Sequence, residues 1–405
     1  MALLRQWLNY KIFFKQLDMK NKNRSLSYNP QYPSIRDLQI KAEKRIPKFA
    51  FEYLEGGCND DINLKRNMTG LQEVVLMPQY LKKYNGHDMS VNLFGHNYDA
   101  PFGISPIGLQ GLIWPNSPEI LAMAGLQHNI PYILSTVSTS SIERIAELSE
   151  GRAWFQLYHP TKNELRDDII KRAAAAQCPV LVVLVDVPSF GFRPRDIRNG
   201  LAMPPRMTVK NILQVVTKPQ WAIGTLIAGI PGFATLKPYM PGNLDMSGLG
   251  QFMNQTFTGR IDMDKIKPIR EMWKGPLVLK GVVSEEDTQM AISLGIDGII
   301  VSNHGGRQID AGESSIKPLK NLAEKFGKQI KIMVDSGLRS GPDIARCLAS
   351  GADFTFMGRP FMYGVGALGK KGGDHTISIL KVQLRQVMEQ LCCEKIDDFP
   401  NHLIQ

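Results

Sequence analysis

The sequence lacks the marks of secreted, metal-binding and membrane-spanning proteins. It has five cysteines in 405 residues, with no C-x-x-C pair. Such an odd, scattered set favours a reducing compartment over a disulfide framework, and no Cys/His spacing indicates a metal site. No apolar run reaches the roughly 18 residues that a membrane-spanning helix requires.

Acidic residues are absent from one long stretch. None occurs between Ile197 and Leu244, whereas the basic residues there are Arg198, Arg206, Lys210, Lys218 and Lys237. The whole chain has a net charge of +10, which suits nucleic acid, an anionic membrane surface or small anionic substrates. The sequence has no zinc-finger spacing, no RNP-like motif and no long basic run, so we expect no nucleic-acid partner.

A signal peptide is also missing. Residues 1–30 mix apolar residues with Arg5, Lys11 and Lys15, and no small-residue cleavage site follows them. We treat residues 1–30 as an extension and residues 31–405 as one domain. A basic amphipathic helix lying on a membrane would explain the extension. A disordered segment, or translation starting at Met19, would explain it equally well.

Short apolar runs alternate with amphipathic stretches through the rest of the chain. The candidate strands are 102–106, 132–135, 154–158, 180–186, 277–280, 298–302, 330–335 and 354–358. Helix-like segments separate most of them, such as 140–150, 162–176, 284–295, 317–326 and 341–351. This alternation predicts an α/β fold with a parallel sheet, and eight repeats fit a closed (β/α)8 barrel. An open doubly wound sheet is disfavoured, because residues 105–111 are not the Gly-x-Gly-x-x-Gly loop expected after its first strand.

One connection is much longer than the others. Residues 187–276 separate the fourth and fifth strands, and we place a basic and apolar insertion at 200–265. Within it, Trp221–Ile230 is apolar but too short to span a bilayer. Basic flanks around an apolar patch suit docking on an anionic membrane surface. A lid packed on the barrel, or a contact between subunits, are the alternatives.

Polar residues follow the strands at their carboxyl ends, where barrels place their chemistry. His304 and Arg307 follow the sixth strand and offer a proton acceptor beside a carboxylate clamp. Asp186 ends the fourth strand; a buried acid needs a partner, and His304 is the natural one. Lys280 closes the fifth strand, and lysine is rarely buried without a partner. After the last two strands come Gly-rich loops with Arg339 and Arg359, a common phosphate site in barrels.

From Tyr32 to Ile396 the chain resembles the FMN-dependent L-2-hydroxy-acid dehydrogenase/oxidase family, which includes glycolate oxidase, L-lactate dehydrogenase and (S)-mandelate dehydrogenase. The matching segments occur in the family's order: 51–57, 105–108, 154–158, 184–196, 277–281, 298–310, 335–339 and 358–360. The resemblance implies FMN as cofactor and oxidation of an L-2-hydroxy acid, lactate or mandelate-like, to the 2-oxo acid.

The resemblance also implies a role for each matching residue. His304 would be the general base, and Asp186 would orient it. The substrate would be bound by Tyr53, Tyr158, Arg193 and Arg307. FMN would be bound by Pro106, Ile107, Gly108, Ser135, Gln156, Lys280, Ser302, Asp335, Gly337, Arg339, Gly358 and Arg359, with Lys280 stabilising the anionic reduced flavin. No metal is implied.

Three positions depart from the family pattern. Leu184 stands where a threonine usually meets the flavin, and Pro194 replaces the glutamate of the usual Arg-Glu-Arg-Asp. Gly108 replaces the alanine of glycolate oxidases, which favours a dehydrogenase over an oxidase. Together with Val137 and Phe190, Gly108 would shape the pocket for the substrate side chain.

The resemblance implies partners as well. Related bacterial lactate and mandelate dehydrogenases carry a membrane-binding insertion here, so we expect a membrane quinone as electron acceptor. We expect the protein on the cytoplasmic side of the inner membrane or in the cytoplasm, as a homo-oligomer, a tetramer by resemblance. The rival hypotheses are an FMN-dependent isomerase, a non-catalytic flavin-binding protein, and an oxidase or monooxygenase that uses O2. The complete catalytic set argues against the first two.

Overall fold

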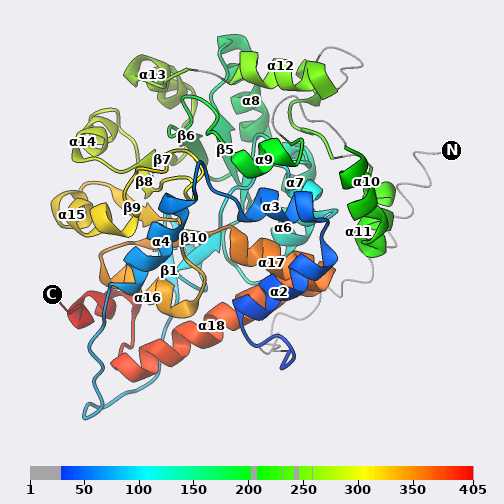
Figure 1. Cartoon of the computed structure of the whole chain (residues 1–405). Helices are drawn as coiled ribbons and strands as arrows, with labels where there is room; N and C mark the ends of the chain where they lie inside the picture. The colour runs from blue at the N-terminus through cyan, green and yellow to red at the C-terminus, as the bar shows by residue number, and fades with distance from the viewer. Residues whose placement is uncertain (1–28, 202–207, 230, 241–245, 258, 405) are drawn as a thin grey trace.

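Eight parallel strands form a closed barrel at the centre of the computed structural model, which describes residues 29–201, 208–229, 231–240, 246–257 and 259–404 (Figure 1). The strands are β3 (Phe102–Ile104), β4 (Ile133–Ser135), β5 (Trp154–Tyr158), β6 (Leu181–Leu184), β7 (Leu277–Val282), β8 (Gly298–Val301), β9 (Lys331–Val334) and β10 (Phe354–Met357). They pair in the order β3-β10-β9-β8-β7-β6-β5-β4, and a parallel bridge between Ile104 and Tyr132 closes the ring. The predicted (β/α)8 fold is therefore confirmed.

Most residues of the strands are apolar because the barrel is packed on both sides. All four residues of β6, β8 and β10 are buried. Side chains that point inward fill the barrel, and those that point outward meet the surrounding helices, so neither face needs polar residues.

A ring of helices surrounds the barrel. In chain order its helices are α6 (Ser117–Gln127), α7 (Ile142–Ser149), α8 (Asn163–Ala175), α13 (Met263–Met272), α14 (Glu285–Ser293), α15 (Ile316–Phe326), α16 (Gly341–Ala349) and α17 (Arg359–Leu368). The long helix α18 (Gly372–Leu391) follows them. Several of these helices are preceded by a serine that caps the amino end. Ser141, Ser284 and Ser340 each accept a hydrogen bond from a backbone N–H of the first turn. The five predicted helical segments all lie on helices of this ring.

The amino end of the barrel is closed by a hairpin that the sequence did not predict. It consists of β1 (Val91–Leu93) and β2 (His96–Tyr98). Trp154 Nε1 donates to the Tyr98 hydroxyl over 3.1 Å, and the rings of Phe94 and Trp154 lie 5.8 Å apart. Because this end is plugged, the carboxyl end is the one open to ligands.

From residue 29 onward, three helices precede the barrel strands: α2 (Ile35–Arg45), α3 (Lys48–Glu55) and α4 (Ile62–Gln72). A short helix, α5 (Gln110–Ile113), follows β3. The predicted extension lies almost entirely outside the described residues, which begin at residue 29.

The predicted insertion is helical. A short helix, α9 (Pro194–Arg198), precedes residues 200–265. Within these bounds lie α10 (Val209–Val216), α11 (Pro219–Ala228), the 3-10 turn η1 (Lys237–Tyr239) and α12 (Met246–Thr256). The next helix, α13, begins at Met263 and already belongs to the ring around the barrel. Arg206, one of the basic residues of the insertion, lies outside the described residues. Within the described ranges, no helix combines the length and the apolarity needed to cross a membrane.

Candidate active site

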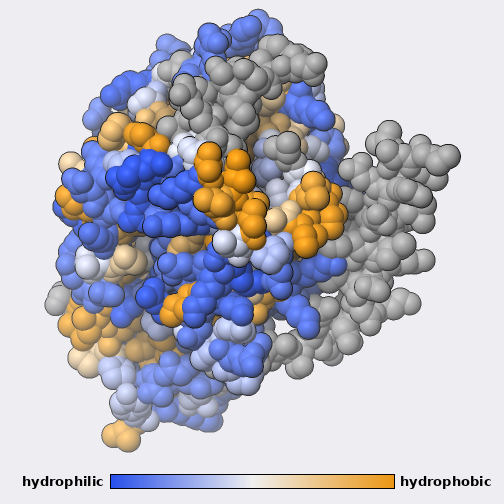
Figure 2. All heavy atoms as spheres, turned by 45° about the vertical axis from the view of Figure 1, so that its right-hand side comes forward, coloured by the Kyte–Doolittle hydropathy of each residue, from blue (hydrophilic) through white to orange (hydrophobic). Residues whose placement is uncertain are grey.

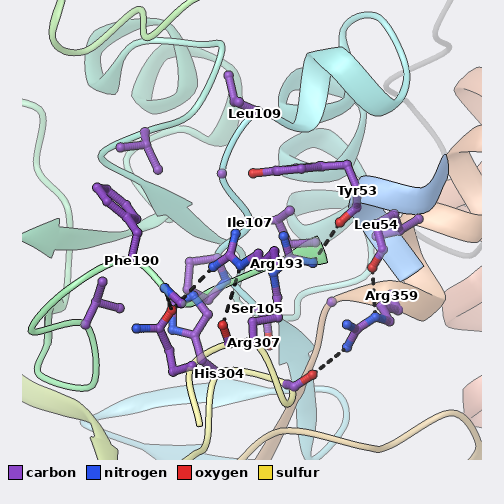
Figure 3. Close-up of a pocket in the computed structure, with 18 of the residues that line it drawn as sticks. Tyr53, Leu54, Ser105, Ile107, Leu109, Phe190, Arg193, His304, Arg307 and Arg359 are labelled. Carbon is purple, nitrogen blue, oxygen red and sulfur yellow. Dashed lines mark hydrogen bonds between the residues drawn. The ribbon is translucent and has the colours of Figure 1, made fainter. Parts of the chain in front are cut away.

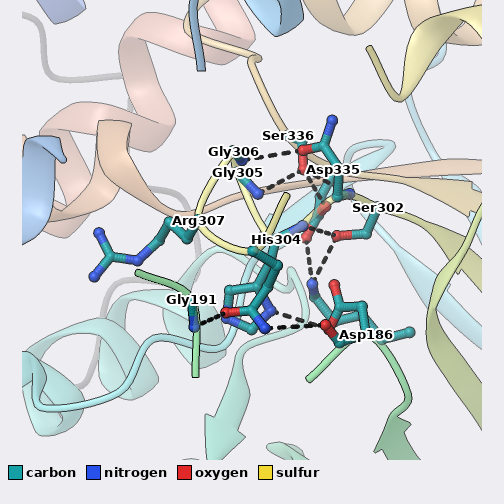
Figure 4. Close-up of polar contacts among 12 residues, drawn as sticks. Asp186, Gly191, Ser302, His304, Gly305, Gly306, Arg307, Asp335 and Ser336 are labelled. Atoms are coloured by element: carbon teal, nitrogen blue, oxygen red, sulfur yellow. Dashed lines mark hydrogen bonds and ion pairs between the residues drawn. The ribbon is translucent and has the colours of Figure 1, made fainter. Parts of the chain in front are cut away.

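A partly buried Asp–His pair lies at the open end of the barrel. His304 Nδ1 donates to Asp186 Oδ1 over 3.0 Å, which joins the residue that follows β6 to the loop after β8 (Figure 4). His304 has a positive φ of 58°, and such left-handed backbone in a residue other than glycine is typical of functional sites. Its N–H donates to Ser302 Oγ over 3.1 Å, which holds the loop in this conformation.

The electrostatics of the pair favour a proton acceptor. Burial lowers the pKa of His304 below its usual 6.5, although the Asp186 charge acts to raise it. Burial alone would raise the pKa of Asp186, but the charges of His304 and Lys280 outweigh it and leave this pKa lowered. At neutral pH the pair is a neutral imidazole and a carboxylate. Since Nδ1 carries the proton toward Asp186, Nε2 is free to accept one.

Lys280 is a second buried charge with partners. Its Nζ lies 3.1 Å from Asp335 Oδ2 and donates to Ser302 Oγ over 2.8 Å. Burial acts to lower the pKa of Lys280, but Asp335 and Asp186 together raise it. The ammonium group therefore stays protonated and presents a fixed positive charge to the cavity.

Arg193 and Arg307, from the loops after β6 and β8, lie close together near His304 (Figure 3). Arg193 Nη1 and Arg307 Nη2 lie 3.8 and 3.9 Å from the same Asp196 oxygen. Burial raises the pKa of Asp196 even though the charges of the two arginines act to lower it. At 3.8 and 3.9 Å, this single carboxylate offsets the charge of the two arginines only in part. Burial lowers the pKa of Arg307 to about 10, which still leaves it charged at neutral pH. The pair is suited to binding the carboxylate of a ligand.

The tyrosines flank the arginines. Tyr53 lies with its ring 5.0 Å from the Arg307 guanidinium carbon. Burial raises the pKa of Tyr158 above its ordinary value, so its hydroxyl stays protonated and can donate a hydrogen bond. Both tyrosines line the same cavity as His304.

Arg359 occupies the other side of this cavity. Its Nε donates to Leu54 O over 2.9 Å, and its Nη1 donates to Gly305 O over 3.1 Å. Burial, together with the nearby Arg339 charge, lowers the pKa of Arg359 to about 10, so it too remains a cation. Gly337 has a φ of 91°, and a Cβ there would lie 2.7 Å from Asn67 O, so this loop requires a glycine.

Most of the predicted residues line one continuous cavity. These are Tyr53, Pro106, Ile107, Gly108, Gln156, Tyr158, Arg193, Lys280, His304, Arg307, Asp335, Gly337, Arg339, Gly358 and Arg359. Asp186 and Ser302 lie behind this wall and hold His304 and Lys280. Ser135 is also buried away from it, and its hydroxyl accepts a 3.4 Å hydrogen bond from Val137 N–H.

The cavity has the chemistry that FMN requires. Ile107 and the backbone of residues 106–108 provide an apolar wall for a flat ring, with Lys280 and Gln156 as polar groups at the same site. Arg339, Arg359 and the glycine loops at residues 337 and 358 provide cations and backbone amides for a phosphate. Ring and phosphate sites thus occur together in one cavity.

Two residues of the site had no role in the sequence interpretation. Gln308 donates to Asp186 O over 3.2 Å and accepts from Gly191 N–H over 3.3 Å, so it joins the catalytic loops. Asp196 is the shared partner of the two arginines. Both stand in segments that matched the family, but only the folded contacts show what they touch.

Comparison with known proteins identifies the family. The model of the family described as FMN-dependent dehydrogenase matches residues 42–405. The chain belongs to the FMN-dependent L-2-hydroxy-acid dehydrogenase family. The predicted resemblance is thereby confirmed: the protein is an FMN-dependent dehydrogenase, and FMN, which accepts two electrons when bound, is its cofactor.

Individual relatives match over nearly their whole length. The chain is 35% identical to L-lactate dehydrogenase of Alcaligenes faecalis over 372 residues, 92% of this chain and 98% of that one. It is 36% identical to L-lactate dehydrogenase of Haemophilus influenzae strain PittEE over 356 residues, 88% of this chain and 93% of that one. Among solved structures, a monotopic membrane protein, (S)-mandelate dehydrogenase, aligns with a TM-score of 0.86 and 30% identity over 93% of this chain and all (100%) of that one.

The lowered pKa of His304 predicts how the rate of flavin reduction depends on pH. The neutral imidazole is the active form, so kcat/KM should be constant at neutral pH and fall only as the pH drops below 6.5. Asp186→Asn removes the charge that acts to raise the pKa of His304, so the midpoint of the pH profile should move to lower pH. The plateau value of kcat/KM should also fall, by a factor of roughly 10²–10⁴. Stopped-flow profiles of both proteins test this. An unchanged midpoint in the variant would contradict the pairing.

His304→Ala should retain FMN but lose activity by a factor of roughly 10²–10⁴ or more. The FMN-binding groups of the cavity are not touched by this change, so the visible flavin spectrum should persist. Measuring flavin content and turnover in the same sample separates the two effects. An active, flavin-loaded variant would remove His304 from the chemistry.

Proposed function

We propose that this protein oxidises an L-2-hydroxy acid to the 2-oxo acid, with His304 as general base. The observation that carries the proposal is the neutral imidazole of the Asp186 pair, which lines one cavity together with the cations Arg193 and Arg307. A 2-hydroxy acid has a carboxylate for the arginines and, one carbon away, a hydroxyl for the base.

Each residue then has a distinct task. Arg193 and Arg307 bind the carboxylate, and the hydroxyl groups of Tyr53 and Tyr158 donate hydrogen bonds beside them. His304 Nε2 accepts a proton from the substrate, and Asp186 stabilises the imidazolium that forms. Hydride transfer and abstraction of the α-proton both fit this arrangement, since both leave a proton on His304.

The pocket for the substrate side chain is apolar and narrow at Gly108. A Cβ on Gly108 would lie 2.8 Å from Val137 Cγ2 and 3.8 Å from the Tyr53 hydroxyl. Leu109, Ile113 and Phe233 continue the apolar lining away from His304. The relatives named L-lactate dehydrogenase and the neighbour named (S)-mandelate dehydrogenase lead us to propose lactate or mandelate as the substrate.

Anaerobic flavin spectroscopy tests this proposal. L-lactate or L-mandelate should bleach the flavin band, whereas a yellow protein that neither acid bleaches would contradict it. Gly108→Ala narrows the pocket beside Val137, so it should slow reduction by mandelate at least about tenfold and reduction by lactate less, as expected for a crowded pocket. Equal effects on both acids would show that Gly108 does not line the side-chain pocket.

We further propose that α10 and α11 place the protein on a membrane. Seven large apolar residues of this pair are exposed: Val209, Ile212, Leu213, Val216, Ile223, Leu226 and Ile227. Their spacing of three and four residues puts them on one face of each helix, and Figure 2 shows apolar side chains gathered on this side of the molecule. We refer to these seven residues as the apolar stripe. Lys210 and Lys218 stand beside it and would meet anionic headgroups.

A membrane quinone is the acceptor that we propose. Leu201, Phe233 and Met253 of the insertion line the same cavity as His304, which gives an apolar molecule a path toward the flavin. The protein would then lie on the cytoplasmic face of the inner membrane. A homo-oligomer remains a prediction of the family resemblance.

Vesicle sedimentation tests the docking surface. Leu226→Ser removes a side chain that is 83% exposed, and its burial in lipid is worth about 1.5–3 kcal/mol. The affinity for vesicles of phosphatidylglycerol and phosphatidylcholine should therefore fall at least tenfold. The matched control is Leu81→Ser, a fully exposed leucine outside the stripe, which should bind like the wild type. Equal losses in both variants would contradict a docking surface at α10–α11.

A further inference from the structure

Helix α10 exposes apolar residues and buries a polar one. Val209, Ile212, Leu213 and Val216 are exposed, whereas Asn211 is only 1% exposed. A buried amide is costly unless its hydrogen bonds are satisfied, so its partners show what this helix is attached to.

Those partners form a chain that leads to α3. Asn211 Nδ2 donates to Asn199 O over 2.9 Å, and Asn199 Nδ2 donates to Glu52 Oε2 over 2.5 Å. A second contact runs parallel to the first, because Phe49 N–H donates to Gln214 Oε1 over 2.9 Å. We call the first of these chains, Asn211–Asn199–Glu52, the amide link.

The two ends of the amide link adjoin residues that bind the substrate. Asn199 directly follows α9, and Arg193 directly precedes it. Glu52 is the neighbour of Tyr53 on α3. A displacement of α10 would therefore act on two elements of the substrate site at once.

The carboxyl end of α3 also holds the buried arginines. Arg307 Nη1 donates to Tyr53 O and Gly56 O, each over 2.7 Å. Arg359 Nε donates to Leu54 O over 2.9 Å. The position of α3 thus sets one arginine of the substrate clamp and one arginine of the expected phosphate site.

The neighbouring helix α11 is attached to the same elements. The Trp221 ring packs edge-on against Phe49 with centroids 5.9 Å apart. Trp221 Nε1 donates to Ile113 O over 3.1 Å, at the end of α5 beside the cavity. The apolar stripe and the substrate site are therefore two sides of one packed unit.

We propose that Asn199 and Asn211 are positioning residues of the oxidation, and that contact of the apolar stripe with a membrane changes the KM for the hydroxy acid through them. The inference rests on the proposed substrate and docking surface. Coupling between two binding sites is reciprocal and typically amounts to 5–150-fold. Anionic vesicles should therefore change KM at least about fivefold. The 2-oxo acid product should change vesicle affinity by the same factor by which vesicles change the dissociation constant of that product.

A charge-matched pair of substitutions tests the amide link in the flavin-loaded protein. Asn199→Asp sets two carboxylates against each other and should raise KM at least about tenfold, with a smaller change in kcat. Adding Glu52→Gln restores a hydrogen bond with donor and acceptor exchanged, so the double variant should return to within about twofold of Glu52→Gln alone, since a swapped pair regains its coupling. A purely structural defect at Asn199 would not be rescued in this way.

The matched control has the same chemistry elsewhere. Asn321 Nδ2 on α15 donates to Glu285 Oε1 over 2.6 Å, and Asn321→Asp should leave KM unchanged. In the vesicle experiment, Asn211→Leu should still bind vesicles, because the stripe is intact, but its KM should no longer respond to them.

The outcomes separate this inference from the proposed function. A wild-type protein whose flavin is bleached by a hydroxy acid, and which binds vesicles with no change in KM, would overturn the coupling and leave the oxidation standing. Failure of the Glu52→Gln rescue would overturn the positioning role. A wild-type flavin that neither acid reduces would instead count against the proposed substrate.

Discussion

Charge buried at the carboxyl end of the barrel is the constraint on which the rest of the structure depends. An ionised group in this cavity is tolerated only where charged or polar partners offset the loss of hydration. Asp186 after β6 is paired with His304 after β8, and Lys280 on β7 with Asp335 after β9. Each pair joins a strand to its second neighbour, so a barrel with another strand order would leave these groups unpaired.

The arginines meet the same constraint by a different route. Arg307 and Arg359 are charged, buried and bonded mainly to backbone carbonyls at the end of α3. Carbonyls at a helix terminus carry partial negative charge and are otherwise unsatisfied. They hold the cations without neutralising them, which leaves positive charge for an anionic ligand. Helices α10 and α11 of the insertion contact α3 at Phe49. The same helix therefore holds both the exposed surface of the insertion and the arginines of the site.

The barrel and much of the site could be predicted because both follow from local patterns. Apolar runs gave all eight strands, and a buried acid at Asp186 required a partner such as His304. The β1–β2 hairpin was missed because each of its strands has only three residues and β2 exposes both His96 and Asn97. The apolar segment that forms α11 could be seen in the sequence. The sequence did not show that α10 buries Asn211 and exposes apolar residues. Contacts such as that between Asn199 and Glu52 join residues far apart in the chain. They leave no trace in the local pattern of apolar and polar residues.

A crystal structure of the flavin-loaded protein with a bound 2-oxo acid would show directly which residues bind the ligand. We expect the carboxylate to bind Arg193 and Arg307 and the 2-oxygen to lie within hydrogen-bond distance of His304 Nε2. A carboxylate bound instead by Arg339 and Arg359, or a 2-oxygen remote from His304, would contradict this expectation.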